Sequence, residues 1–260
     1  MTSLQETARK FDQDGFVILR QLFSEDEISE LKQQLDDFIR HEVPLLEPGQ
    51  VYFEDVPSRP IKAIHRLEAR SAYFRRLLAE PRILQVVQTI FAGSDILPEA
   101  VMYFAKQAVA GSVTPAHQDN AFQHWDPPEA LTVTVAVDES TPANGPLICL
   151  KGSHKLGVLP YRQSGVLGFS RALASPADTR VYREVALCLE PGDVALHHIN
   201  TIHRSEANPS PRHRRQIGLG YRSTRARRDE QGHERYLQDL DRLHKDNRAA
   251  LESADAKGQS

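Results

Sequence analysis

The order of hydrophobic and polar residues predicts helices near the start of the chain. Residues 4–14 have a weak helical period, and residues 16–19 then form a short apolar run that predicts a strand. Ser24 and Glu27 have the spacing of a capping box, in which two residues satisfy backbone N–H groups at a helix start. The helix that follows carries an apolar stripe, which is typical of packing against a core. The residues of this stripe are Ile28, Leu31, Leu35 and Phe38.

Beyond this helix the pattern changes to a loop, a helix pair and then strands. Four prolines interrupt residues 41–66, which predicts an irregular loop. Residues 74–91 have helical period, with a break at Pro81. The remaining apolar runs are short, rich in β-formers and separated by turn residues, which is the spacing of a double-sheet jelly roll or another sandwich. These runs are residues 100–110, 131–137, 147–150, 181–189, 194–198 and 217–221.

The composition excludes several classes of protein. With 32 Lys and Arg against 35 Asp and Glu, the 260-residue chain has a formal charge of -3, which argues against general affinity for nucleic acid or anionic membranes. No apolar run approaches the length of a membrane span, and we expect no secretory leader. Cys149 and Cys188 lie in apolar runs, which predicts buried free thiols in a reducing compartment. We therefore expect a cytoplasmic protein, a monomer or homodimer, that acts on a small molecule. We expect one domain over residues 1–252 and a disordered tail over residues 253–260.

The candidate chemistry centres on His117-Gln118-Asp119. On one extended strand the side chains of His117 and Asp119 would fall on the same face, because strand side chains alternate with period two. His203, from a distant segment, would complete a set of two histidines and one carboxylate, which leaves coordination positions open on Fe(II). A His-x-Asp triplet alone fits a polar strand end equally well. Among the neighbouring histidines, His198 is a candidate for supporting a metal ligand.

Several segments, in order along the chain, resemble the phytanoyl-CoA dioxygenase family of iron- and 2-oxoglutarate-dependent oxygenases. The opening FDQDGFVILRQLFSEDEISELKQQLDDFI is similar to the amino-terminal helix and strand of that family, and the resemblance extends from residue 11 to residue 222. It implies a mainly β fold, the cupin-like double-stranded β-helix or jelly roll, with amino-terminal helices outside one sheet. The other matching pieces are HQD, NGPLICLKGSHKLG, PGDVALHHINTIHRSEAN, and an arginine eleven residues after His203.

The resemblance also implies the cofactors and the residues that bind them. His117, Asp119 and His203 would hold Fe(II), and Arg214 would hold the distal carboxylate of the co-substrate 2-oxoglutarate, with O2 as the oxidant. A planar guanidinium suits this task because it can donate two parallel hydrogen bonds to a carboxylate. Arg215 stays as an alternative to Arg214. Further positions that match co-substrate contacts in the family are Ser205, Thr134, Lys62 and Met102.

Other interpretations of the roles of several of these residues stay open. Thr134 and Met102 fit ordinary core packing equally well, and Lys62 fits a solvated loop. Residues 160–180 form either a lid over the site or a surface loop. The charged segment 222–251 has a partial apolar stripe, which predicts a terminal helix docked on the body or on a second subunit. Residues that follow the triplet closely enough to line a substrate pocket are Phe122, His124 and Trp125.

The implied reaction is hydroxylation of an unidentified small molecule, with release of succinate and CO2. Asp119 argues against halogenation, because halogenating relatives have Gly or Ala at this position. Desaturation and ring formation stay open. Two other classes are a metal-dependent cupin-like enzyme that does not use 2-oxoglutarate and a catalytically silent small-molecule binding protein. Arg214 argues against the first of these classes, and the intact triad argues against the second.

Overall fold

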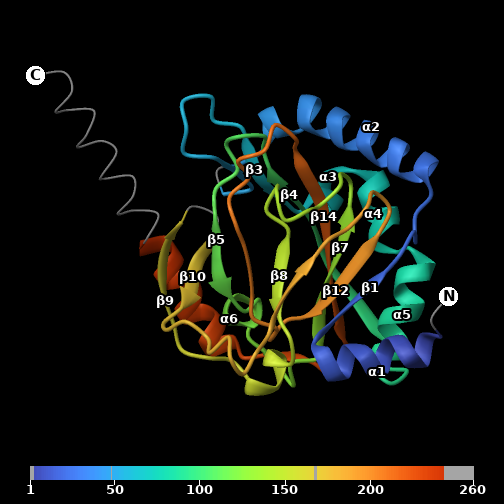
Figure 1. The fold of residues 1–260 in the computed structure, drawn as a ribbon, viewed down its shortest axis with the longest axis vertical. Helices are drawn as coiled ribbons and strands as arrows, with labels where there is room; N and C mark the ends of the chain where they lie inside the picture. Colours follow the sequence, from blue (N-terminus) through green and yellow to red (C-terminus); the bar gives the residue numbers. More distant parts are fainter. Residues whose placement is uncertain (1–2, 48, 167–168, 243–260) are drawn as a thin grey trace, which may run out of the picture.

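The structure, a computed structural model of the chain, describes residues 3–47, 49–166 and 169–242 (Figure 1). The tail predicted over residues 253–260 and the predicted domain end at residue 252 lie outside the described residues. The described chain is built around two antiparallel sheets, one of which is covered by helices. This arrangement is the predicted one, mainly β with helices outside one sheet.

The larger sheet has seven strands, in the order β1-β12-β7-β14-β4-β3-β2, and every neighbouring pair in it is antiparallel. Strands of the smaller sheet lie in sequence between β4, β7, β12 and β14 of the larger sheet, so the chain crosses repeatedly between the two sheets. The strands of the larger sheet are β1 (Phe16–Leu19), β2 (Val51–Phe53), β3 (Ile61–His65), β4 (Ile96–Lys106), β7 (Ala130–Ala136), β12 (Val194–His198) and β14 (Arg214–Ser223).

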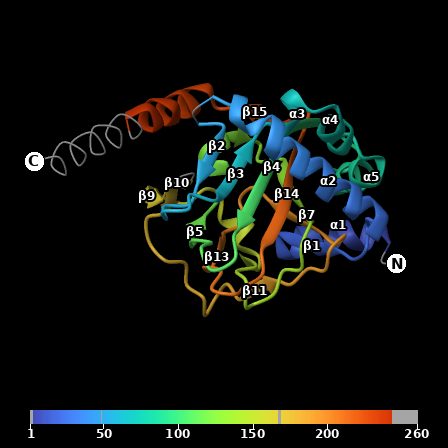
Figure 2. The same ribbon diagram turned by 90° about the horizontal axis from the view of Figure 1, so that it is seen from above.

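The smaller sheet has four strands, in the order β11-β8-β13-β5, and lies on the side of the larger sheet away from the helices (Figure 2). Two further strand pairs lie outside both sheets: β9 (Tyr161–Val166) pairs with β10 (Phe169–Leu173), and β6 (Trp125–Asp126) pairs with β15 (Arg227–Arg228). The strands of the smaller sheet are β5 (Thr114–His117), β8 (Leu147–Leu150), β11 (Glu184–Leu187) and β13 (His203–Ser205).

Five helices cover the outer face of the larger sheet (Figure 2). Short helical segments α6 (Asn120–Gln123), η1 (Val43–Leu45) and η2 (Ser153–Leu156) lie in connections, and residues 230–242 form a further helix. Within the described chain, no helix combines the length and the apolar composition that crossing a bilayer requires. The five covering helices are α1 (Leu4–Asp14), α2 (Glu25–His41), α3 (Leu67–Arg70), α4 (Ala72–Leu78) and α5 (Pro81–Ile90).

Helix α2 begins and packs as its sequence predicts. The Ser24 hydroxyl accepts a hydrogen bond from the Glu27 backbone N–H, and the Glu27 carboxylate accepts one from the Ser24 N–H, so the capping box is confirmed. Leu31 and Leu35 are fully buried in the core between the helices and the larger sheet. This core fixes the position of the sheet whose other face forms the cavity described below.

Two details of the sequence interpretation were wrong. The predicted irregular loop at residues 41–66 contains the edge strand β2 and its neighbour β3. Residues 160–180 contain the paired strands β9 and β10, which fit either of the two expected forms, a lid or a surface loop. The runs in question are only three to six residues long, too short to show a period. Cys149 is buried as expected, but Cys188 is exposed, because it follows the end of β11.

Replacing Leu35 with alanine is expected to destabilise the fold by about 2–5 kcal/mol, because a buried leucine leaves a cavity that its neighbours fill only in part. The free energy of unfolding in urea measures this effect. Leu45→Ala is the matched control, since Leu45 is 62% exposed in η1. Equal destabilisation by the two changes would show that α2 does not pack as described.

Candidate metal centre and its cavity

Two histidines lie side by side on neighbouring strands of the smaller sheet. His117 ends β5 and His203 begins β13, and the two residues are register partners with ring centroids 4.2 Å apart. Each ring places Nδ1 at a backbone carbonyl, His117 at Pro115 (2.7 Å) and His203 at Thr201 (2.9 Å). A carbonyl can only accept a hydrogen bond, so Nδ1 carries the proton in both rings and the Nε2 lone pairs are free to bind a metal.

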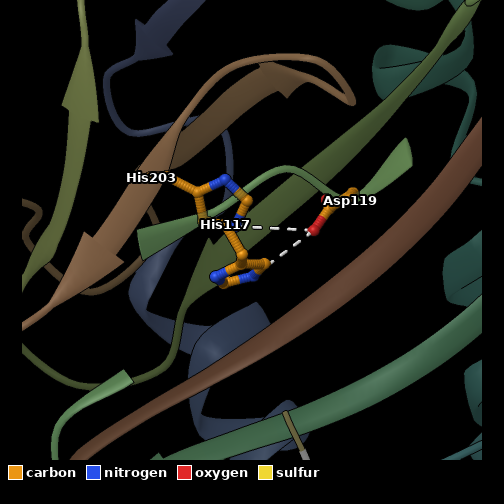
Figure 3. A group of neighbouring side chains, drawn as sticks. All are labelled: His117, Asp119 and His203. Carbon is orange, nitrogen blue, oxygen red and sulfur yellow. Dashed lines mark ion pairs between the residues drawn. The ribbon is translucent and has the colours of Figure 1, made fainter. Parts of the chain in front are cut away.

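Asp119 completes the group (Figure 3). Its Oδ1 lies 3.7 Å from His117 Nε2 and 3.4 Å from His203 Nε2, and the three candidate ligand atoms are all within 4.8 Å of one another. The other oxygen, Oδ2, accepts hydrogen bonds from the Thr132 hydroxyl (2.7 Å) and from His197 Nε2 (3.1 Å). The supporting histidine is therefore His197, on the inner face of β12, and not the candidate His198.

The strand argument for this pair of ligands was wrong in its geometry. Strand β5 ends at His117, and Asp119 has the helical dihedrals φ -60° and ψ -32° at the start of α6. Between them, the buried Gln118 amide donates hydrogen bonds to the Gly157 and Asn200 carbonyls. The chain therefore turns at Gln118, and this turn, not the alternation of a strand, brings the imidazole and the carboxylate together.

Burial sets the charge state of the three residues. It lowers the pKa of His203 to about 3 and also lowers the pKa of His117, so both rings are neutral near neutral pH. Burial alone would raise the pKa of Asp119, but positive charge on any of the surrounding histidines and the hydrogen bond from His197 lower it, so the carboxylate stays ionised. Two neutral imidazoles and one carboxylate with free donor atoms are a suitable set for a divalent iron ion.

The triad lies in the wall of a cavity of about 470 Å³ that both sheets line. The structure places four of the predicted co-substrate residues in this wall, and Arg214 is the one that stands out. It is 5% exposed, and its Nη1 donates to the Gln216 side-chain oxygen, while its Nε and the Gln216 Nε2 have no partner among the described residues. The four residues are Met102, Thr134, Ser205 and Arg214.

Arg214 is therefore a buried cation without a carboxylate partner in the described chain. Burial lowers its pKa to about 10, which still leaves it charged near neutral pH. The alternative, Arg215, is on the opposite face of β14 and is already paired, with Nε and Nη2 donating to the Asp138 carboxylate at 2.8 and 3.0 Å. A buried charge is unfavourable unless it is paired, so the Arg214 site fits an anionic ligand.

Three predicted residues do not line this cavity. Lys62 donates to the Ser112 hydroxyl (2.9 Å) and lies 4.0 Å from the Glu54 carboxylate, behind the ring of Phe169. His124 follows α6 in a left-handed conformation, and its ring contacts Arg171 and His233. Trp125 belongs to a separate apolar cluster, between two arginine side chains. The predictions for His124 and Trp125 failed because closeness in sequence to the ligands says little about direction once the chain turns, and the family match for Lys62 did not reveal its buried partners Glu54 and Ser112.

Sequence reasoning also missed most of the aromatic wall. Only Phe122 was expected, and its ring contacts His117 with centroids 5.7 Å apart. Phe104 had a usable signal, since it lies two residues after Met102 on β4 and shares its face. The others come from segments far apart in sequence and had no such signal. The aromatic residues that line the cavity besides Phe122 are Tyr52, Phe104, Phe169 and Tyr236.

The comparison with known families agrees with this geometry. The family model described as "Phytanoyl-CoA dioxygenase (PhyH)" matches residues 11–216, which is most of the chain. The chain belongs to the phytanoyl-CoA dioxygenase family. Its fold is the double-stranded β-helix of that family, and Fe(II), 2-oxoglutarate and O2 are its cofactor and co-substrates.

Individual members of the family show the same relationship. A "Probable alpha-ketoglutarate-dependent hypophosphite dioxygenase" of Stutzerimonas stutzeri is 28% identical, over 83% of this chain and 77% of the relative. The ectoine dioxygenase of Sphingopyxis alaskensis is 26% identical, over 78% of this chain and 71% of the relative. The crystal structure of EctD from S. alaskensis with bound Fe superposes with a TM-score of 0.72 and 25% identity, covering 88% of this chain and 79% of that chain. Membership of this dioxygenase family therefore explains why the chain carries a triad of potential iron ligands.

Replacing Thr132 with valine is expected to weaken Fe(II) binding by about 10–100-fold, because it removes one of the two hydrogen bonds that orient the Asp119 carboxylate. A titration of the purified protein with Fe(II) under nitrogen measures the affinity. Thr132→Ser keeps the hydroxyl and should stay near the wild type. Unchanged affinity in Thr132→Val would mean that His197 alone positions Asp119.

Proposed function

We propose that the protein hydroxylates a small molecule whose reacting part is uncharged and largely apolar, with Fe(II) held by His117, Asp119 and His203 and 2-oxoglutarate held by Arg214. The observation that carries this proposal is the buried, unpaired guanidinium of Arg214 in the same cavity as the triad. A metal enzyme that did not use 2-oxoglutarate would have no need for this cation. A silent binding protein would have no need for three converging ligand atoms.

When bound, iron and 2-oxoglutarate supply the activation of O2 and the oxidation of a C–H bond, with release of succinate and CO2. The protein's own residues position the iron and the co-substrate and exclude bulk water. His117 and His203 present unprotonated Nε2 atoms, and Asp119 presents Oδ1 while Thr132 fixes its other oxygen. Arg214 holds the distal carboxylate of the co-substrate, and the packed sheets on either side keep bulk water from the reacting centre.

The hydroxyl groups of Ser205 and Thr134 would assist Arg214 in holding the co-substrate. Ser205 lies on β13 two residues after His203, and Thr134 lies on β7 two residues after Thr132. Both are buried, and both line the cavity with Arg214. A buried hydroxyl that donates to a carboxylate is a favourable partner for a charged oxygen. Met102, which lies opposite Gly218 on the strand next to β14, lines the same cavity and would supply an apolar contact.

The rest of the cavity lining indicates the substrate class. Beyond Asp119 and Arg214, no described residue that lines the cavity carries a permanent charge. His65 is also in the wall, and burial lowers its pKa, so it is neutral near neutral pH. An anion or cation would lose its hydration there without gaining a partner, which is costly. Phe104, Phe122 and their aromatic neighbours instead favour a ring or an apolar chain.

The setting in the cell is part of the same proposal. The two cysteines of the chain are free thiols, which supports a reducing compartment such as the cytoplasm. That the protein is a monomer or a homodimer stays a prediction.

Replacing Arg214 with methionine is expected to raise the apparent KM for 2-oxoglutarate by about 30-fold or more, because a buried charged hydrogen-bond partner is lost. The weak visible band of the anaerobic Fe(II) and 2-oxoglutarate complex reports binding directly. Arg212→Met is the matched control, since Arg212 is exposed and pairs with Glu139. No band in the wild type would refute the use of 2-oxoglutarate, and an unchanged KM in Arg214→Met would refute the role of Arg214.

Screening small molecules for succinate release above the uncoupled rate is expected to select uncharged compounds with a ring or apolar chain. The sharpest comparison uses sets that share one skeleton and differ only in carrying an amide, a carboxylate or an ammonium group. Release that is stimulated most by the carboxylate or ammonium members would contradict the substrate class. It would leave the oxygenase reaction itself intact.

A further inference from the structure

One buried cation has no part in the reaction proposed above. Arg171, on β10, is 4% exposed, and its guanidinium lies between two tyrosine rings, 3.9 Å from the centroid of Tyr161 and 4.5 Å from that of Tyr236. Tyr161 begins the partner strand β9, and Tyr236 belongs to the helix at residues 230–242. These two cation–π contacts offset part of the cost of burying the charge.

The same guanidinium also contacts the segment that follows the metal ligands. Its Nη1 donates to the backbone carbonyl of Ala121 in α6 and lies 3.2 Å from His124 Nε2 at the end of that helix. Its Nη2 lies 3.9 Å from the Asp239 carboxylate. Arg171 therefore connects β10, α6 and the carboxyl-terminal helix, three segments far apart in sequence that lie side by side in Figure 1.

The helix that Arg171 contacts supplies part of the cavity wall. Tyr236 and Leu240 are four residues apart, so they share one helix face, and both line the cavity. The Tyr236 ring contacts Phe122 with centroids 5.8 Å apart, and its hydroxyl lies 3.5 Å from Ser170 Oγ. This helix lies after residue 216, where the match to the family ends.

A second, smaller cavity lies behind this wall. Its volume is about 210 Å³, and it shares Ser170, Tyr236 and Leu240 with the larger cavity. The two side chains of the helix therefore stand between the two spaces. Shortening either side chain, or letting the helix move away, would enlarge the space open to a substrate on that side.

We propose that Tyr236 and Leu240 are specificity-determining residues that limit the size of the substrate, and that Arg171 is the positioning residue that holds their helix in place. This inference rests on the proposed function, since it concerns the same cavity. A guanidinium suits the positioning task because it presents two flat faces and several donors at once, which a lysine ammonium does not.

The test compares two uncharged fluorescent probes of different size, 1-naphthylamine and N-phenyl-1-naphthylamine, on the anaerobic Fe(II) and 2-oxoglutarate complex of the full chain. In Leu240→Ala the dissociation constant of the larger probe, relative to the smaller one, is expected to fall by about tenfold, since even one methylene in a pocket can change selectivity that much. Arg171→Met should shift this ratio in the same direction. Leu237→Ala, on an exposed position of the same helix, and Arg180→Met, at an exposed arginine, should leave it unchanged.

A double variant separates positioning from a general loss of structure. If Arg171 acts through the helix, adding Arg171→Met to Leu240→Ala should change the probe ratio less than the sum of the single effects. Additive effects, or the same shift in the control variants, would overturn the role of Arg171. An unchanged ratio in Leu240→Ala would overturn the whole inference, even where Arg171→Met failed to fold. The visible band of the wild type tests the proposed function separately.

Discussion

On three neighbouring strands, β7, β12 and β14, side chains point alternately toward the helices and toward the cavity. The rest of the molecule depends on this alternation. Residues of one parity on these strands pack under the helices, including Val133, Leu196 and Ile217. Several of the residues between them are polar and line the cavity. A slip of one residue in any of these strands would exchange the two sets and would place charged groups in the core. The inward-facing polar residues include Thr132, Thr134, His197, Arg214 and Gln216.

The polar interior that results has a cost in stability, and the structure offsets it unevenly. At Oδ2 of Asp119 the offset is complete, because Thr132 and His197 donate to it, whereas Oδ1 faces the unprotonated Nε2 atoms of the two triad histidines, which donate nothing to it. Around Arg214 the offset is incomplete, because its Nε and the Gln216 amide nitrogen lack partners in the described chain. Buried groups left unpaired in an otherwise well-packed protein are typical of sites that a ligand completes. Under the proposed function, the distal carboxylate of 2-oxoglutarate would offset the unfavourable burial of Arg214.

Features that a few neighbouring residues determine could be predicted from the sequence. Features that depend on contacts between distant segments could not. The capping box of α2 and the alternation on β7 are local, and both were predictable from a few residues. His203 and Arg214 became candidates through a family resemblance, since no local pattern separates them from other histidines and arginines. The turn that places Asp119, and the stacking of Arg171 between two rings, depend on contacts across the chain. No periodicity encodes such contacts, so they had to be observed.

The origin of each part of the cavity suggests how one reaction can serve different substrates. The groups assigned to iron and the co-substrate come mainly from strands that are fixed by pairing on both sides, such as β7, β13 and β14. The aromatic side chains around the substrate space come largely from β2, β10, α6 and the carboxyl-terminal helix, which are an edge strand and peripheral segments. Peripheral segments tolerate sequence change better than central strands do. A change in the wall would therefore alter which molecule is admitted while leaving the three iron ligands and Arg214 in place.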